Sequence, residues 1–221
     1  MKPKVSVKTS AGAQTRTTVI NSLLICGIAV AVVQIAGDML AAALYPGYSY
    51  VNQTVSELSA IGAPTRSFLV VVGVLYIALV VAFAVGVWKA AGLTRAMRIT
   101  AVLLAVFALN ALVWAFFPVQ QRGSEMAATD IAHIGGAILQ VLTMVLFIAF
   151  GSGADGRWFR IFSILMIAAI LIAGGAAATQ ASRVGQGLPT PWLGLIERVS
   201  FYGPSLWILT LAAVLLRERR A

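Results

Sequence analysis

The chain has few charged residues, one cysteine and one histidine. The last two shortages argue against a disulfide within the chain and against a zinc site. Only 10% of its 221 residues are charged, and only seven are Asp or Glu. The single cysteine, Cys26, excludes a disulfide within the chain. The single histidine, His133, makes a poor zinc site even with carboxylates beside it. We therefore expect no metal and no other cofactor.

Apolar sequence is abundant. Hydrophobic residues make up 60% of the chain, more than one water-soluble core can bury, so the composition indicates a polytopic membrane protein. Six apolar runs are long enough to cross a hydrocarbon layer ~30 Å thick as helices. We predict an all-α bundle over 18–217, preceded by a disordered cytoplasmic arm, 1–17. The six predicted transmembrane helices span about 19–44, 67–88, 97–117, 130–150, 159–180 and 195–216.

The net charge of +9 is unevenly distributed. When the termini and loops are assigned alternately to the two sides of the membrane, twelve Lys or Arg residues fall on one side. Only Arg66, Arg122, Arg183 and Arg198 fall on the other. The positive-inside rule then predicts cytoplasmic termini in the cell (plasma) membrane. We expect membrane lipids as partners and no nucleic acid, because the basic excess reflects topology.

The first outer loop, 45–66, is the longest polar segment between two apolar runs. Thr54 and Glu57 match a capping box, in which each side chain bonds the other residue's amide. This pattern predicts a short interfacial helix over 55–61, lying as an ordered cap over the bundle. Ser56 resembles a nucleophile only in residue type, because a serine inside a capping box needs no such role.

Asp38 lies about two turns below the outer end of the first predicted helix. A carboxylate at that depth is costly unless it faces protein or water, so it is a candidate functional residue. The alternative is that Asp38 pairs with an arginine or accepts hydrogen bonds from hydroxyl groups at a helix contact. The sequence leaves both interpretations open.

Asp130 and His133 are spaced i and i+3 at the start of the fourth predicted helix, so they share one face. Such a pair suits acid–base catalysis or a proton relay. The structural alternative is an aspartate that caps the helix and a histidine that is hydrogen-bonded at the interface.

Glu197 and Arg198 are adjacent at the start of the sixth predicted helix, so we expect them to have different partners. Five of the seven acids fall at the outer side, which makes that end the predicted site. The predicted binding residues are Asp38, Ser56, Glu57, Glu197 and Arg198, beside the catalytic candidates Asp130 and His133.

Several short motifs accompany the six apolar runs. They are Ser56-Glu57-Leu58, Gly62-Ala63-Pro64, His133 at a helix head, and a Gly194-to-Arg198 segment that leads into a helix with Trp207. With them the chain resembles a bacterial membrane family known as domain of unknown function nine-nine-eight, and distantly the Frag1 and DRAM membrane proteins. The resemblance implies fold and topology and no activity.

Three functions agree with these observations. The first is a non-catalytic protein that binds a lipid headgroup or an amphiphilic small molecule at the outer face, as an accessory protein, a homo-oligomer or the partner of another membrane protein. The second is a membrane enzyme that acts on a lipid with Asp130 and His133. The third is a proton-linked transporter that uses Asp38 and His133.

Overall fold

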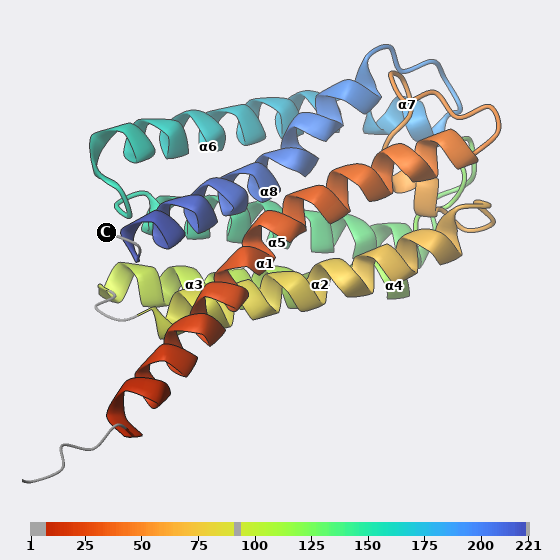
Figure 1. Cartoon of the computed structure of the whole chain (residues 1–221). Helices are drawn as coiled ribbons and strands as arrows, with labels where there is room; N and C mark the ends of the chain where they lie inside the picture. Colours follow the sequence, from red (N-terminus) through yellow and green to blue (C-terminus); the bar gives the residue numbers. More distant parts are fainter. Residues whose placement is uncertain (1–7, 91–93, 220–221) are drawn as a thin grey trace, which may run out of the picture.

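The computed structural model describes residues 8–90 and 94–219, and this part of the chain is helical without a strand (Figure 1). Six of its helices are long and apolar enough to span a membrane. The predicted all-α fold with six spanning helices is therefore confirmed. The elements are α1 (Lys8–Leu44), η1 (Ser56–Ser59), α2 (Arg66–Lys89), α3 (Arg95–Asn110), α4 (Val113–Phe116), α5 (Ala128–Gly151), α6 (Gly156–Ala178), α7 (Ala181–Gly185) and α8 (Leu193–Glu218).

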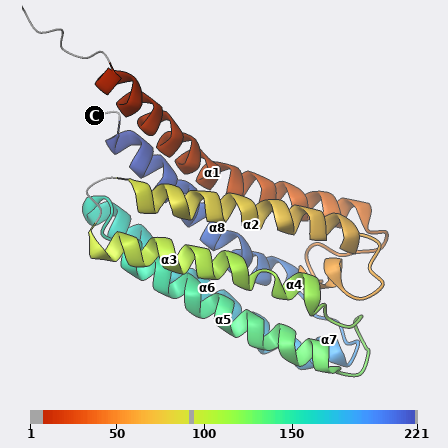
Figure 2. The same ribbon diagram turned by 90° about the horizontal axis from the view of Figure 1, so that it is seen from below.

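The long helices pack side by side in a ring. α1 packs against α2 and α8, α3 against α2 and α5, and α6 mainly against α8 with a smaller contact to α5. Three connecting segments lie at one end of the bundle, where the first carries η1, the second follows α4 and the third carries α7, and the C-terminal end of α8 lies at the other end (Figures 1 and 2). We call the segments 45–65, 117–127 and 179–192 the cap.

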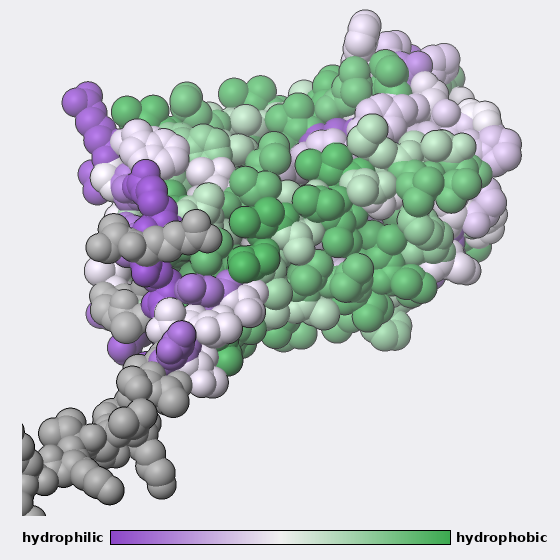
Figure 3. Space-filling view, viewed as in Figure 1, coloured by the Kyte–Doolittle hydropathy of each residue, from purple (hydrophilic) through white to green (hydrophobic). Residues whose placement is uncertain are grey.

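The surface of the bundle between its two ends is apolar (Figure 3). Large side chains such as Val71, Ile138 and Ile172 are 67–73% exposed. Exposed apolar residues in such numbers would aggregate in water, whereas hydrocarbon accommodates them. The chain is therefore a multi-pass membrane protein.

Two element boundaries differ from prediction. α1 begins at Lys8, so the predicted disordered arm is helical from there on, and residues 1–7 of that prediction lie outside the described residues. No proline interrupts this stretch, and its Lys, Ala, Gln and Arg residues favour a helix more than its Thr, Ser and Gly residues do. The predicted interfacial helix over 55–61 is one 3₁₀ turn, η1.

The third predicted helix divides into α3 and α4. The Asn110 amide donates to the Gly136 carbonyl at 2.9 Å and to Gln140 at 2.5 Å, both on α5. The backbone turns at residues 111 and 112 before α4 begins. A polar tie between helices therefore coincides with the break in the helix.

α8 continues through Pro204, which lacks an amide to donate. Gln34 on α1 donates to the nearby Phe201 carbonyl at 3.0 Å and accepts from the Ser205 hydroxyl. Tyr76 on α2 contacts the Ser205 hydroxyl at 3.3 Å. Side chains of α1 and α2 thus hydrogen-bond α8 close to the proline.

Candidate functional site in the cap

The first cap segment is bonded to the start of α8. The Leu195 amide donates to the Val51 carbonyl at 3.3 Å, and the Thr190 hydroxyl donates to the Asn52 carbonyl at 2.7 Å. The Asn52 side-chain oxygen accepts from the Trp192 amide at 3.1 Å. These bonds hold the segment as the ordered cap that the loop sequence predicts.

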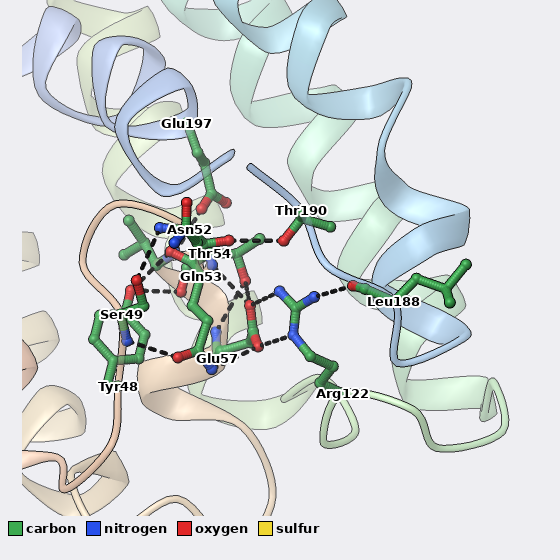
Figure 4. Close-up of polar contacts among 11 residues, drawn as sticks. Tyr48, Ser49, Asn52, Gln53, Thr54, Glu57, Arg122, Leu188, Thr190 and Glu197 are labelled. Atoms are coloured by element: carbon green, nitrogen blue, oxygen red, sulfur yellow. Dashed lines mark hydrogen bonds and ion pairs between the residues drawn. The ribbon is translucent and has the colours of Figure 1, made fainter. Parts of the chain in front are cut away.

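Glu57 lies at the centre of the cap and is 4% exposed (Figure 4). Its carboxylate accepts from the Thr54 amide at 2.7 Å, and the Thr54 hydroxyl accepts from the Glu57 amide at 3.3 Å, so the predicted capping box is present. Arg122, from the second cap segment, donates to both carboxylate oxygens at 2.8 and 2.9 Å. Gln53 adds a further bond at 3.1 Å. The carboxylate is therefore saturated by donors.

These contacts set the charge of Glu57. Burial acts to raise the pKa of Glu57, but the bonds from Arg122, the Thr54 amide and Gln53 outweigh it and lower the pKa below its usual 4.5. The carboxylate is ionised at neutral pH and, paired with Arg122, adds no net charge to the cap.

The lowered pKa predicts loss of stability in acid. The contribution of Glu57 is complete above about pH 4.5 and falls as the pH drops from there through the lower folded-state pKa, because the unfolded chain then binds the proton more readily. Thermal unfolding in detergent, followed between pH 7 and pH 3, should show the difference between wild type and Glu57→Gln shrinking with acidification. A difference that stays constant over this range would contradict the assignment.

Asp38 pairs with Arg198, which was one of its two predicted environments. The Arg198 guanidinium donates to the two Asp38 oxygens at 2.8 and 3.0 Å, and both side chains are at most 3% exposed. The Tyr202 hydroxyl also donates to Asp38. The ion pair joins α1 to α8 within the membrane-spanning part of both helices. Both oxygens of the Asp38 carboxylate accept hydrogen bonds from Arg198.

Residues of the cap and α8 occupy the other donors of Arg198. One terminal nitrogen donates to the Tyr50 carbonyl at 2.8 Å and the Gly194 carbonyl at 3.1 Å, and the other donates to the Tyr48 hydroxyl at 3.0 Å. The guanidinium carbon lies 3.5 Å from the centre of the Tyr50 ring, a close cation–π contact. Burial raises the pKa of Tyr48, so this phenol stays neutral. Arg198 therefore has a structural environment with every donor engaged.

Glu197 faces away from Arg198, as predicted for adjacent helical residues. Its carboxylate accepts from the Val55 amide at 2.5 Å and from the Ser56 hydroxyl at 3.4 Å. Ser56 thus lies against an acid at the start of η1. The five predicted binding residues form two clusters, with Asp38 and Arg198 in one and Ser56, Glu57 and Glu197 around the first cap segment.

Asp130 and His133 are not hydrogen-bonded to each other within the described chain. The two Asp130 oxygens accept from the amides of Gln120 and Ala127, each at 2.8 Å, so Asp130 caps the start of α5. His133 is buried, with Nδ1 2.8 Å from the Phe117 carbonyl, and this carbonyl requires the proton on Nδ1. The geometry agrees with the structural alternative, and the acid–base function stays a prediction.

A groove of about 380 Å³ lies in the cap beside Arg122. Arg122 is 20% exposed, and three of its five N–H groups donate to Glu57 and to the Leu188 carbonyl. Its other two N–H groups, and the Asn52 side-chain amide, have no partner among the described residues. Two of the residues that line the groove therefore keep free donors. Its lining consists of Asn52, Gln53, Arg122, Gly187, Leu188, Pro189, Thr190 and Pro191.

None of the eight residues that line the groove was among the predicted site residues, and Arg122 and Asn52 are the two that carry free donors. Arg122 is one of only four basic residues assigned to the acid-rich side, which signals an acid partner, but Glu57 lies 65 positions away and could not be selected. Asn52 carries no comparable signal, because its role depends on how the third cap segment packs against it.

These features define a multi-pass helical membrane protein with a hydrogen-bonded cap and a donor-lined groove. The family model described as "Protein of unknown function (DUF998)" matches residues 28–214, and the chain belongs to this family. The predicted resemblance to domain of unknown function nine-nine-eight is thereby confirmed. Comparisons with curated proteins and with solved structures found no significant match.

Proposed function

We propose that this protein is a non-catalytic binding protein that holds the phosphate-bearing headgroup of a lipid or another amphiphile in the groove. The observation that carries the proposal is the state of Arg122: Glu57 fixes its guanidinium, and two N–H groups remain free at the groove. An arginine oriented by an acid is well suited to bind phosphate oxygens.

The rest of the groove supports the same chemistry. Asn52 offers two amide donors beside Arg122. Among the described residues the only carboxylate in contact with Arg122 is that of Glu57, which is saturated by donors. Leu188, Pro189 and Pro191 add apolar surface suited to the glycerol and first methylene groups of an amphiphile. The charge distribution of the chain supports a cap on the outer face of the plasma membrane, with cytoplasmic termini.

The enzyme and transport alternatives gain less support. Asp130 is occupied by two backbone amides, and Asp38 is paired with Arg198. With these partners, neither carboxylate is free to bind a substrate or a transported proton.

Arg122→Gln tests the proposal. Because charge-assisted hydrogen bonds are worth about 1.5–3 kcal/mol, we expect roughly tenfold or greater loss of affinity for glycerol 3-phosphate and a matching loss of co-purified phospholipid. Direct binding measurements and native mass spectrometry in mild detergent provide the readouts.

Arg183→Gln is the control for loss of a positive charge at the same end, since the Arg183 side chain is exposed and, among described residues, donates only to the Pro189 carbonyl. It should retain wild-type binding. Equal binding by wild type, Arg122→Gln and Arg183→Gln, with all three folded, would refute the proposal.

A further inference from the structure

The end of the bundle opposite the cap carries cations that the protein itself does not neutralise. Four of them are exposed and make no hydrogen bond or ion pair with a described residue: Lys89, Arg95, Arg157 and Arg160. Arg98 is exposed as well, and its guanidinium carbon lies 5.9 Å from the centre of the Trp88 ring. We call these five residues the basic rim.

The arginines at the cap end are bound differently. Arg122 and Arg198 pair with carboxylates, while Arg66 and Arg183 donate to backbone carbonyls. Every described arginine at that end therefore has an acceptor within the protein. Exposure alone does not explain the basic rim, because Arg183 is exposed and still has an acceptor.

The acids near the basic rim do not compensate it. Asp155, directly before α6, accepts from Trp158 Nε1 and from Arg217, each at 2.7 Å. Glu218, at the end of α8, is exposed and forms no ion pair with a described residue. The rim cations thus keep their charge free for an anion from outside the protein.

Helix electrostatics also disfavour the cations of the rim. Its four arginines lie within the first five residues of α3 or α6, and neither helix has an acid in its first turn. The partial positive charge at a helix N-terminus repels cations and attracts anions. The fold therefore gains no stability from placing arginines there, whereas a bound phosphate would offset the repulsion.

The rim arginines lie on the sides of the helices that face lipid. Arg157 is followed at helical spacing by Ile161 and Ile164, which are 47 and 58% exposed. Arg98 is followed four residues later by Val102, which is 51% exposed. Figure 3 shows hydrophilic side chains as a band directly against the apolar surface at this end. The cations therefore lie where the lipid-facing surface ends, beside the headgroups.

Two tryptophans mark the same level. Trp88 and Trp158 are 52 and 49% exposed, and each lies next to a rim residue in the sequence. Exposed tryptophan at the end of a spanning helix is typical of the headgroup region of a membrane. This position favours a lipid headgroup over a soluble acidic protein as the partner.

We infer that the basic rim binds anionic phospholipids of the leaflet at that end of the bundle. Topology requires cations on one side of the membrane, but it does not require them on the lipid-facing sides of α3 and α6. The inference is independent of the groove, which lies at the opposite end.

Arg157→Gln combined with Arg160→Gln tests the inference in the full chain. Each cation near an anionic headgroup is worth roughly a fivefold gain in affinity. Titration with phosphatidylglycerol, followed by native mass spectrometry in mild detergent, should therefore show roughly five- to twentyfold weaker binding. Binding of zwitterionic phosphatidylcholine should not change. Arg157→Lys combined with Arg160→Lys keeps both charges and should retain most of the phosphatidylglycerol binding.

A measurement on the wild-type protein covers failure of the glutamine variant to insert. The preference for phosphatidylglycerol over phosphatidylcholine should shrink as the salt concentration rises from about 0.05 to 0.5 M, because salt screens exposed charges. A preference that is unchanged over this range would overturn the inference.

The variants separate this inference from the function of the groove. Loss of phosphatidylglycerol binding in Arg122→Gln, with wild-type binding in the folded glutamine rim variant, would overturn the inference and leave the headgroup function standing. Equal binding of both phospholipids by wild type would also overturn it. Tight binding of soluble polyglutamate, without a preference between the phospholipids, would identify an acidic protein segment as the partner and overturn the inference as well.

Discussion

Asp38→Asn and Arg198→Gln are each expected to lower the free energy of unfolding by about 3–5 kcal/mol, the usual effect of removing one partner from a buried ion pair. Each change leaves the other charged group in a site where both side chains are at most 3% exposed. Arg198→Gln also removes donors from the Tyr50 and Gly194 carbonyls and the cation–π contact with Tyr50. Its effect should therefore be the larger of the two. Unfolding by a denaturing detergent, or thermal unfolding in a mild one, measures the loss.

Two comparisons make this prediction specific. The exposed pair Arg217–Asp155, with 65% of the arginine side chain accessible, should contribute less than about 1 kcal/mol, so Arg217→Gln serves as the control. Asp38→Leu combined with Arg198→Met removes both charges and should be less destabilised than the sum of the single changes. Additive losses would show that the two groups do not stabilise each other.

Gly194→Ala is expected to detach the first cap segment from α8 and to cost about 1–3 kcal/mol or more. A Cβ atom at this position would overlap with the carbonyl oxygens of Tyr50 and Gln53. Both obstacles are backbone atoms, so no side-chain rotation relieves the clash. Hydrogen exchange should increase over 45–65, and glycerol 3-phosphate binding should weaken because Asn52 and Gln53 line the groove.

Gly73→Ala and Gly135→Ala are controls on α2 and α5, because a Cβ at either position meets no atom within 4 Å. Alanine in these helices should be neutral or stabilising by up to about 1 kcal/mol. Unchanged exchange over 45–65 in Gly194→Ala would contradict the close approach of the segment to α8.

Local features of the fold could be predicted from the sequence. α2 extends over Arg66–Lys89 against a predicted 67–88, because an uncharged apolar run of that length has few alternatives to a spanning helix. The capping box of Thr54 and Glu57 was likewise readable, because both its bonds join residues three apart.

Contacts between residues far apart in the sequence could not be predicted from local patterns. Asp38 and Arg198 are 160 positions apart, and a periodic apolar pattern does not specify which of several helices face each other. The break after Asn110 was missed for the same reason, since it coincides with hydrogen bonds to α5 that no local motif announces. The groove is formed by cap segments from three separate parts of the chain. The sequence could therefore predict at which end of the bundle a site lies, but not which residues line it.

The distance along the chain between Asp38 and Arg198 also has a consequence for biogenesis. Ribosomes synthesise α1 long before α8. During membrane insertion Asp38 and the amide of Val55 therefore lack their partners, Arg198 and Glu197, until α8 is made. A chain that stops before Leu193 would expose an unpaired carboxylate within the bilayer and an unbonded cap segment. Cellular quality control should therefore recognise chains that lack α8.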